Sequence, residues 1–167
     1  MMTFATPDPQ WIIKPWGRMK TFVLNTPASV LVENGAFVVC AGGRCVPING
    51  EGVDWGVQNI HWDSQDPCTV KILEVLPGQR LSDQRHRHRS EQWDVLTPGA
   101  MVDIEGEKEG ARHIEPVVGD CIVIPVGSWH RLGCRNDAVG PVIILEISTG
   151  PFSEDDIERR SDDYGRK

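Results

Sequence analysis

The sequence has 167 residues and a mass of 18.6 kDa, which suits one domain with its own hydrophobic core. Its 17 Lys and Arg against 24 Asp and Glu give a formal net charge of -7, which argues against a nucleic-acid surface because such a surface needs a basic footprint. No apolar run approaches the roughly 20 residues of a membrane span, so we expect no membrane partner.

Two further features of the composition point to the fold class and the compartment. Seventeen Gly and twelve Pro are typical of many short strands joined by turns rather than of long helices. The five cysteines are odd in number and lack the spacing of a metal site, so we expect reduced thiols and a cytoplasmic protein. Cys40 and Cys45 flank the tight turn at Gly42-Gly43, where a hairpin could bring them close together; we expect instead that both are ordinary buried thiols.

The first part of the chain predicts short strands around tight turns. Apolar runs on either side of Glu33-Asn34-Gly35 indicate a hairpin, and another run follows Gly42-Gly43. A linker rich in Gly and Asp surrounds one more candidate strand before residue 68. The elements expected here are an irregular stretch at 1–20, strands at 29–32, 36–40 and 44–48, and a loop at 50–67 around a strand at 57–62.

From residue 68 onward, turn signals recur about every 8–12 residues, which favours a sandwich or barrel over alternating strands and helices. The expected strands are 69–76, 92–96, 101–105, 111–115, 121–124 and 141–148. The one helical candidate is 153–160, where Ser153 can cap the first turn and three acidic residues favour its N-terminal dipole. The sequence therefore predicts an all-β fold with a short C-terminal helix.

The densest chemical signal lies in residues 81–93. On a strand, alternate side chains share a face, so Gln84, His86 and His88 should point one way and the three arginines between and after them the other. Imidazole nitrogens together with the carboxylate of Glu91 can hold a first-row divalent metal. His130 follows a turn that aims one side chain, and it supplies a further ligand.

The spacing of these residues matches the two motifs of the cupin fold. The first motif runs from Gly78 through Gln84 and His86 to Glu91, with Gln in place of its first His. The second runs from Gly119 through Pro125 and Gly127 to His130, with a predicted hairpin between the two motifs. We therefore expect a cupin barrel, a double-stranded β-helix of the jelly-roll type, at 55–167, with 1–54 as an N-terminal extension of extra strands packed on it.

Around these motifs the sequence resembles the type II mannose-6-phosphate isomerases, a cupin domain that also forms the C-terminal part of bifunctional isomerase/mannose-1-phosphate guanylyltransferases. The resemblance covers residues 55–166. The residues that carry it are Leu81-Ser82, Gln84, His86, His88-Arg89, Glu91, Trp93, Gly119, Ile124-Pro125, Gly127, His130-Arg131-Leu132, Pro141, Glu154-Asp155-Asp156-Ile157, Arg159 and Asp163-Tyr164-Gly165-Arg166.

The resemblance implies a metal-dependent aldose–ketose isomerase that interconverts mannose 6-phosphate and fructose 6-phosphate. It implies that the metal ligands are Gln84, His86, Glu91 and His130. The expected metal is Zn²⁺, with Co²⁺, Mn²⁺, Fe²⁺ or Ni²⁺ as alternatives. Whether His88 joins or replaces Gln84 as a ligand stays open, and otherwise His88 should line the cavity.

Catalytic and substrate-binding residues follow from charges in unusual places. Lys71 and Glu146 each interrupt an apolar run, so they face a polar cavity or an exposed edge; the alternative is an ion pair between them with no catalytic task. Arg89 and Arg131 are candidates to bind phosphate or a developing oxyanion, because guanidinium groups hold such oxygens bidentately. Strand parity puts Arg131 on the face opposite His130, so it reaches the cavity only if the strand bends. Trp129 is a candidate to stack on a sugar.

Two other functions remain open from the sequence. One is a small biosynthetic cupin, such as a cyclase, epimerase or dioxygenase, that acts on a non-phosphorylated metabolite. The other is a cupin that binds a small molecule without turnover. Basic residues in the cavity would favour the sugar-phosphate isomerase, and an apolar lining would favour the biosynthetic enzyme. We also expect a homodimer.

Overall fold

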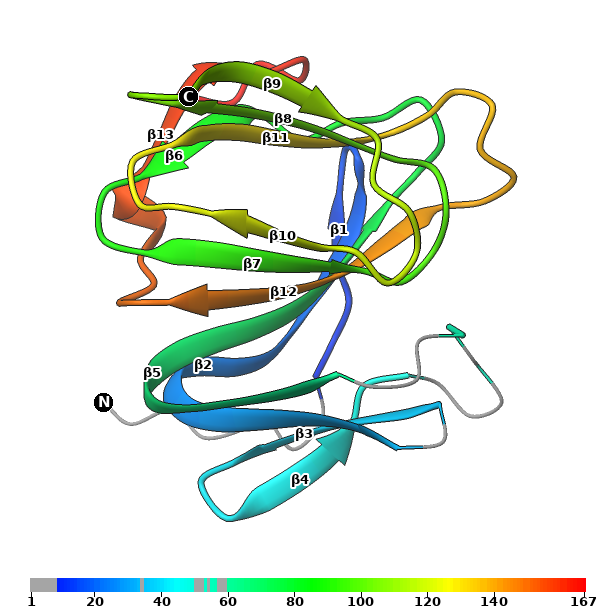
Figure 1. Ribbon diagram of the computed structural model, residues 1–167, viewed down its shortest axis with the longest axis vertical. Helices are drawn as coiled ribbons and strands as arrows, with labels where there is room; N and C mark the ends of the chain where they lie inside the picture. The colour runs from blue at the N-terminus through cyan, green and yellow to red at the C-terminus, as the bar shows by residue number, and fades with distance from the viewer. Residues whose placement is uncertain (1–8, 34, 50–52, 54, 57–59) are drawn as a thin grey trace.

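The computed structural model describes residues 9–33, 35–49, 53, 55–56 and 60–167, and these form two antiparallel sheets (Figure 1). The larger sheet has the order β10-β7-β12-β5-β2-β3-β4, with β1 paired to β2, and the smaller has the order β13-β6-β11-β8-β9. Its strands are β1 (Ile12–Lys14), β2 (Gly17–Glu33), β3 (Ala36–Ala41), β4 (Arg44–Pro47), β5 (His61–Val75), β6 (Asp83–His86), β7 (Ser90–Val95), β8 (Ala100–Gly106), β9 (Gly110–Ile114), β10 (Cys121–Ile124), β11 (Trp129–Cys134), β12 (Val142–Thr149) and β13 (Ile157–Ser161).

The upper part of Figure 1 is a barrel in which one end of the larger sheet faces the smaller sheet. Its interior is packed by apolar side chains from both sheets, among them Val75, Val95, Val102, Leu132 and Ile144. The expected all-β cupin architecture is confirmed, and both motifs lie where that fold places them, one on β6 and β7 and the other between β10 and β11.

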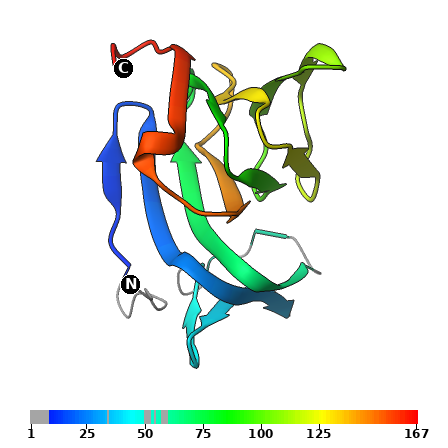
Figure 2. The same cartoon turned by 90° about the vertical axis from the view of Figure 1, so that its left-hand side faces the viewer.

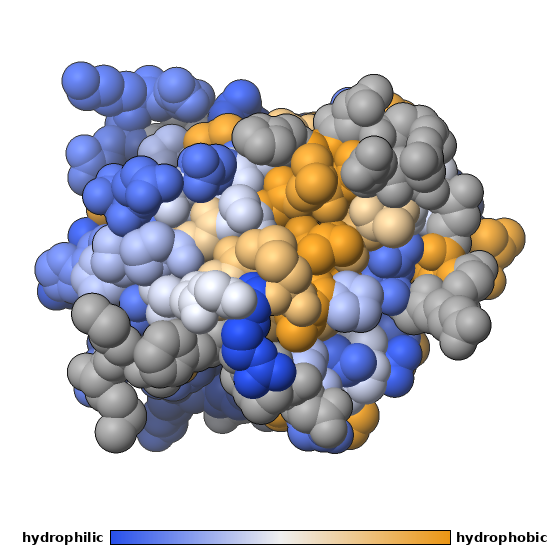
Figure 3. All heavy atoms as spheres, turned by 90° about the horizontal axis from the view of Figure 1, so that it is seen from below, coloured by the Kyte–Doolittle hydropathy of each residue, from blue (hydrophilic) through white to orange (hydrophobic). Residues whose placement is uncertain are grey.

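A second apolar core lies below the barrel, where β3 and β4 pack with the bent halves of β2 and β5 (Figure 1). Phe22, Val30, Phe37 and Val39 are almost completely buried there. On the outer side of this part, seen from below in Figure 3, apolar side chains gather in the middle of the face.

The homodimer expected from the sequence stays a prediction.

The N-terminal strands and the barrel share one sheet. β2 pairs with β5 from Gly17↔Val75 to Leu31↔His61, with register shifts between Thr21 and Ala28. Figure 2 shows β1, β2 and β5 running alongside one another, with the C-terminal segment across them. The predicted boundary at residue 54 lies outside the described residues, and the division at that point stays a prediction.

The strands expected at 29–32, 36–40, 44–48 and from residue 69 onward are present. The strand expected at 57–62 lies partly outside the described residues, and the loop expected up to residue 67 is wrong from His61 onward, because β5 begins there. The irregular stretch expected at 1–20 is also wrong in its described part, which holds β1 and the start of β2.

The expected C-terminal helix is wrong. Ser153 does cap a turn, since its Oγ accepts a hydrogen bond from the Asp155 N–H at 3.2 Å. That turn is a 3₁₀-helix of three residues, Glu154–Asp156, after which the chain enters β13 and pairs with β6. Pairing with the open edge of β6 satisfies the backbone better than an isolated short helix would.

The expectation of five reduced thiols is also wrong. Cys40 and Cys45 are directly opposite each other in the β3–β4 ladder and form a disulfide, because antiparallel register brings their Cα atoms within 4.1 Å. Cys68, Cys121 and Cys134 are free. In the described part of the chain, no helix has the length and apolarity needed to cross a membrane.

Candidate metal centre and cavity

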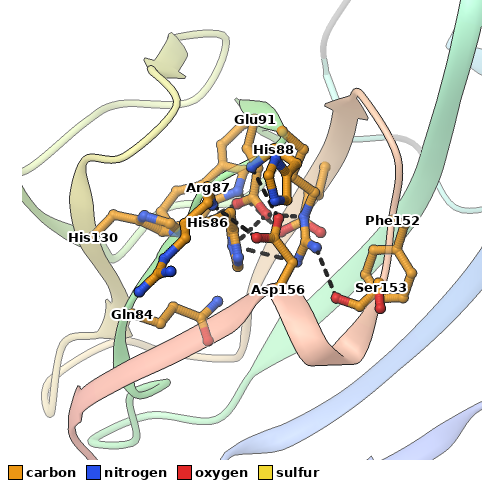
Figure 4. A network of polar contacts seen from close by, with 12 residues as sticks. Gln84, His86, Arg87, His88, Glu91, His130, Phe152, Ser153 and Asp156 are labelled. Atoms are coloured by element: carbon orange, nitrogen blue, oxygen red, sulfur yellow. Dashed lines mark hydrogen bonds and ion pairs between the residues drawn. The ribbon is translucent and has the colours of Figure 1, made fainter.

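Three buried side chains converge inside the barrel (Figure 4). His86 ends β6, Glu91 lies near the start of β7, and His130 lies near the start of β11. His86 Nε2 is 2.9 Å from Glu91 Oε1, and His130 Nε2 is 3.4 Å from Glu91 Oε2. In the described part of the chain, these three are the His, Cys, Asp and Glu side chains whose ligand atoms lie close enough together, in a group of three or more, to share a metal ion. The two motifs are thus brought together as the sequence predicts.

The backbone fixes which nitrogen of His130 faces the cluster. Nδ1 lies 2.9 Å from the carbonyl oxygen of Ser128, so it carries the proton and donates it to that oxygen. Nε2 then presents a lone pair to the carboxylate of Glu91. Because both groups are acceptors, the arrangement is favourable only with a cation between them, either a proton or a metal ion.

Burial and the short contacts shift the acid–base properties of all three groups. Burial opposes ionisation of Glu91, yet the adjacent imidazoles of His130 and His86 favour its ionised form and hold its pKa well below the ordinary value. Burial lowers the pKa of His86 despite the neighbouring carboxylate. Burial has the same tendency at His130, but the Glu91 carboxylate outweighs it, and the pKa is raised. The cluster therefore keeps an ionised carboxylate out of contact with water.

The unpaired atoms of the cluster fit a metal ion. Glu91 Oε2, His130 Nε2 and His86 Nδ1 are buried without a hydrogen-bond partner. Two imidazoles and one carboxylate form a nitrogen and oxygen donor set that suits Zn²⁺ and neighbouring first-row divalent ions. Gln84 is directly opposite His130 in the β6–β11 ladder, and its Oε1 accepts a hydrogen bond from Ser82 Oγ at 3.0 Å. Its side chain lines the cavity next to Glu91.

Above the cluster, Lys71 and Glu146 line the same cavity. They are directly opposite each other in the β5–β12 ladder, and both are buried. Glu146 Oε2 accepts a hydrogen bond from the indole Nε1–H of Trp93 at 3.1 Å. Burial and the charge of Glu91 raise the pKa of Glu146 to about 7, and burial lowers the pKa of Lys71. Their apolar neighbours pack in the two cores, with Val70, Ile72, Leu145 and Ile147 in one and Leu73 and Ile144 in the other.

The turn between β6 and β7 reverses the faces that parity predicts. β6 ends at His86, so Arg89 turns inward and is buried, with Nε 3.5 Å from Glu91 Oε1 and Nη2 3.4 Å from His86 Nε2. His88 turns outward and is exposed, and its backbone N–H donates to Asp156 Oδ2 at 3.1 Å. His88 is not part of the cluster or of this cavity; it lines a separate hollow with Arg87 and Asp156.

Arg131 and Trp129 lie on the outer face of the smaller sheet. Arg131 donates from Nη2 to Ser161 Oγ at 2.6 Å, and Trp129 stacks with the guanidinium groups of Arg85 and Arg160 at 4.7 Å each. β11 does not bend, so parity holds here and keeps both side chains away from His130.

Several cavity residues have no counterpart in the sequence prediction. Phe152 lies against the cations of the site, Trp16 comes from the turn between β1 and β2, and Met19 comes from β2. Arg159 and Arg166 come from the C-terminal segment. Of these residues, only Arg159 and Arg166 belong to the motifs that carry the family resemblance in the sequence. The cavity that they enclose has a volume of about 70 Å³.

Comparison with known proteins agrees with this picture. The family of mannose-6-phosphate isomerase C-terminal domains matches residues 53–162. The mannose-1-phosphate guanylyltransferase of Escherichia coli strain K12 is 37% identical over 105 residues, which cover 62% of this chain and 20% of that protein. The alginate biosynthesis protein AlgA of Pseudomonas aeruginosa is 39% identical over 98 residues, which cover 58% of this chain and 19% of that protein. The chain therefore spans about a fifth of the length of these relatives.

Among solved structures, the capsular polysaccharide assembling protein CapF from Staphylococcus aureus is similar with a TM-score of 0.58. At 13% identity the likeness covers 92% of this chain and 33% of that chain, so it concerns the fold alone. Because it extends over almost all of the chain, the N-terminal strands belong to the shared architecture as well.

Proposed function

The chain belongs to the mannose-6-phosphate isomerase C-terminal family, and we propose that it is a metal-dependent sugar-phosphate isomerase that interconverts mannose 6-phosphate and fructose 6-phosphate. The observation that carries the proposal is the buried cluster of His86, Glu91 and His130 beside a cavity with a separate acid–base group, Glu146. We assign the metal to this cluster together with Gln84, and Zn²⁺ suits the donors best.

The reaction moves one proton between C1 and C2 and a second between the oxygen atoms on these carbons, and it needs a base and a stabiliser of negative charge. A divalent cation bound by the cluster would act as a Lewis acid toward the oxygen atoms of the sugar. Glu146, held by Trp93, would take the proton from C1 of fructose 6-phosphate and return it to C2. Lys71 and Arg89 would stabilise the negative charge that develops on the substrate oxygens, so Arg89 takes the role expected of Arg131.

The charges around the cavity favour a phosphorylated substrate over the neutral metabolite of the alternative reading. The lining contains five basic side chains and three acidic ones, which are Lys14, Lys71, Arg89, Arg159 and Arg166 against Glu91, Glu146 and Glu154. Basic groups that converge on one cavity recognise phosphate oxygens. The nucleotidyl transfer in the names of the relatives is not carried over, since the chain spans only about a fifth of their length.

The test is conversion of fructose 6-phosphate to mannose 6-phosphate by the purified chain loaded with Zn²⁺, Co²⁺ or Mn²⁺. We expect turnover with at least one metal, and a loss of about 1,000-fold or more in kcat/KM for His130→Ala together with loss of bound metal. His113→Ala is the matched control, because His113 is exposed and pairs with Asp103 at 2.7 Å outside the barrel. A wild-type protein that binds metal but converts neither sugar with any of the three ions would overturn the proposal.

A further inference from the structure

An aromatic ring covers the two cations of the cavity. Lys71 Nζ lies 3.8 Å and Arg89 Cζ 4.5 Å from the centroid of Phe152, within the range of cation–π contacts. The Phe152 ring comes from the connection between β12 and β13, next to the carbonyl oxygen of Ser153, which accepts from Arg89 Nη1 at 3.3 Å. Figure 4 shows Phe152 and Ser153 across the site from His130.

The ring is held from the N-terminal strand β2. Asn25 binds the backbone of Phe152 at two points: its Oδ1 accepts from the Phe152 N–H at 2.7 Å, and its Nδ2 donates to the Phe152 carbonyl oxygen at 3.2 Å. The Asn25 backbone N–H donates in turn to Thr69 Oγ1 at 3.2 Å. This pairing ties the connection after β12 to the middle of the sheet.

Asn25 adopts an unusual backbone conformation to do this. Its φ of 48° is the only positive value among the described residues other than glycine, and it lies where β2 shifts register against β5. An outlier of this kind persists only where the surroundings hold it, and such outliers gather at functional sites. Asn25 also lies outside residues 53–162, so the family match does not include it.

The ring of Phe152 is one wall of a small cavity. The volume of this cavity, about 70 Å³, is well below the roughly 300 Å³ at which ligand pockets begin. Most of the lining belongs to strands fixed by ladder hydrogen bonds, whereas Phe152 stands on a connection whose backbone is fixed by Asn25. The ring is therefore the wall whose removal enlarges the site with the least change to the sheets.

We propose that Phe152 is a specificity-determining residue that limits the size of the substrate at the mouth of the cavity, and that Asn25 is the positioning residue that holds it there. The inference rests on the proposed isomerase function. It assigns to the N-terminal strand a role in choosing among phosphorylated ketoses, with preference for those of six carbons or fewer.

The experiment compares kcat/KM for fructose 6-phosphate and the seven-carbon sedoheptulose 7-phosphate. We expect Phe152→Ala to raise the ratio of the seven-carbon to the six-carbon substrate by about tenfold or more, and Phe152→Leu to raise it less. Asn25→Gly keeps the left-handed backbone and removes only the clamp, so it should raise the ratio as well. Asn25→Asp retains the oxygen that accepts from Phe152 and should restore most of the wild-type ratio.

Thr97→Ala is the matched control. Thr97 Oγ1 also joins two backbone groups, accepting from Ile143 N at 2.7 Å and donating to the Pro141 carbonyl oxygen at 3.0 Å, away from the cavity. It should leave the ratio unchanged. If Asn25→Gly and Phe152→Ala lower kcat/KM for both ketoses equally, their role is only structural and the inference fails.

A second readout separates this inference from the proposed function. Acetic anhydride labelling of Lys71, followed by mass spectrometry, reports on the covering of that amine whether or not the chain turns over a sugar. We expect labelling to rise about fivefold or more in Phe152→Ala and Asn25→Gly and to stay unchanged in Thr97→Ala. Unchanged labelling in the first two variants would overturn the inference. Raised labelling in a chain that isomerises no sugar would overturn the proposed function alone.

Discussion

Gly150 allows the chain to pass close to the turn that carries Arg89. The variant Gly150→Ala tests how much free energy is needed to displace that turn. Its φ of +111° lies where side chains are strained, and an added Cβ would overlap the carbonyl oxygen of His88 and lie 3.1 Å from Arg89 Cα. The backbone strain alone is worth about 1–3 kcal/mol. Because backbone rather than a flexible side chain must also move, we expect a total loss of about 3–5 kcal/mol in the free energy of unfolding.

Two other glycines separate the contributions. Gly110, at φ +69° in the turn between β8 and β9, has nothing within 4 Å of an added Cβ, so Gly110→Ala should cost only the strain of about 1 kcal/mol. Gly140 has neither a positive φ nor a neighbour within 4 Å, so Gly140→Ala should change stability by less than about 0.5 kcal/mol.

Urea unfolding followed by tryptophan fluorescence measures all three variants. The difference between Gly150→Ala and Gly110→Ala gives the cost of displacing the turn. We also expect Gly150→Ala to weaken metal binding, because Glu91 follows that turn directly. A loss for Gly150→Ala no larger than that for Gly110→Ala would refute the reasoning, since it would mean that the His88–Arg89 backbone yields freely.

Two further predictions concern titrating groups. A base acts only when deprotonated, and burial together with the charge of Glu91 raises the pKa of Glu146 to about 7. We therefore expect log kcat/KM to rise with pH up to about 7 and then to level off, and Glu146→Gln to lower kcat by about 100-fold or more. A flat pH profile in the wild type would contradict the assignment of Glu146 as the base. Burial and the neighbouring Asp94 raise the pKa of Cys121 from 9.0 to about 11, so iodoacetamide should modify it about 100-fold more slowly at pH 8 than an unperturbed thiol. Asp94→Asn should accelerate the reaction, and equal rates in the two proteins would refute the role of Asp94.

The strands of the barrel could be predicted from the sequence because their apolar runs are local features. The β8–β9 hairpin and the apolar part of β12 follow from patterns that a few consecutive residues carry. The buried cluster of His86, Glu91 and His130 could be predicted because the spacing of a motif does not depend on exact element boundaries. β13 could not, since its strand character comes from pairing with β6 rather than from Ile157–Ser161 itself.

The errors at His88 and Arg89 have one physical origin. Strand parity applies only while a strand continues, and the turn after His86 places Arg89 inside and His88 outside. The same limit explains why the sequence did not predict that the N-terminal strands contribute residues to the cavity. Register shifts between Thr21 and Ala28 break the alternation of apolar and polar residues that is typical of a strand, so the sequence around Asn25 shows no period of two.

The buried charges of the cavity explain why metal and substrate should bind together. Lys71 and Arg89 oppose Glu91 and Glu146, so the four buried groups carry no net charge when all are ionised. Such compensation is what makes ionised groups tolerable inside a protein. A divalent cation in the cluster would leave an excess of two positive charges, which a phosphate ester with two negative charges neutralises. Under the proposed function, the small volume would act with the charge: the metal-loaded site would attract a phosphorylated sugar, and the ring of Phe152 would limit how much of its carbon chain can enter.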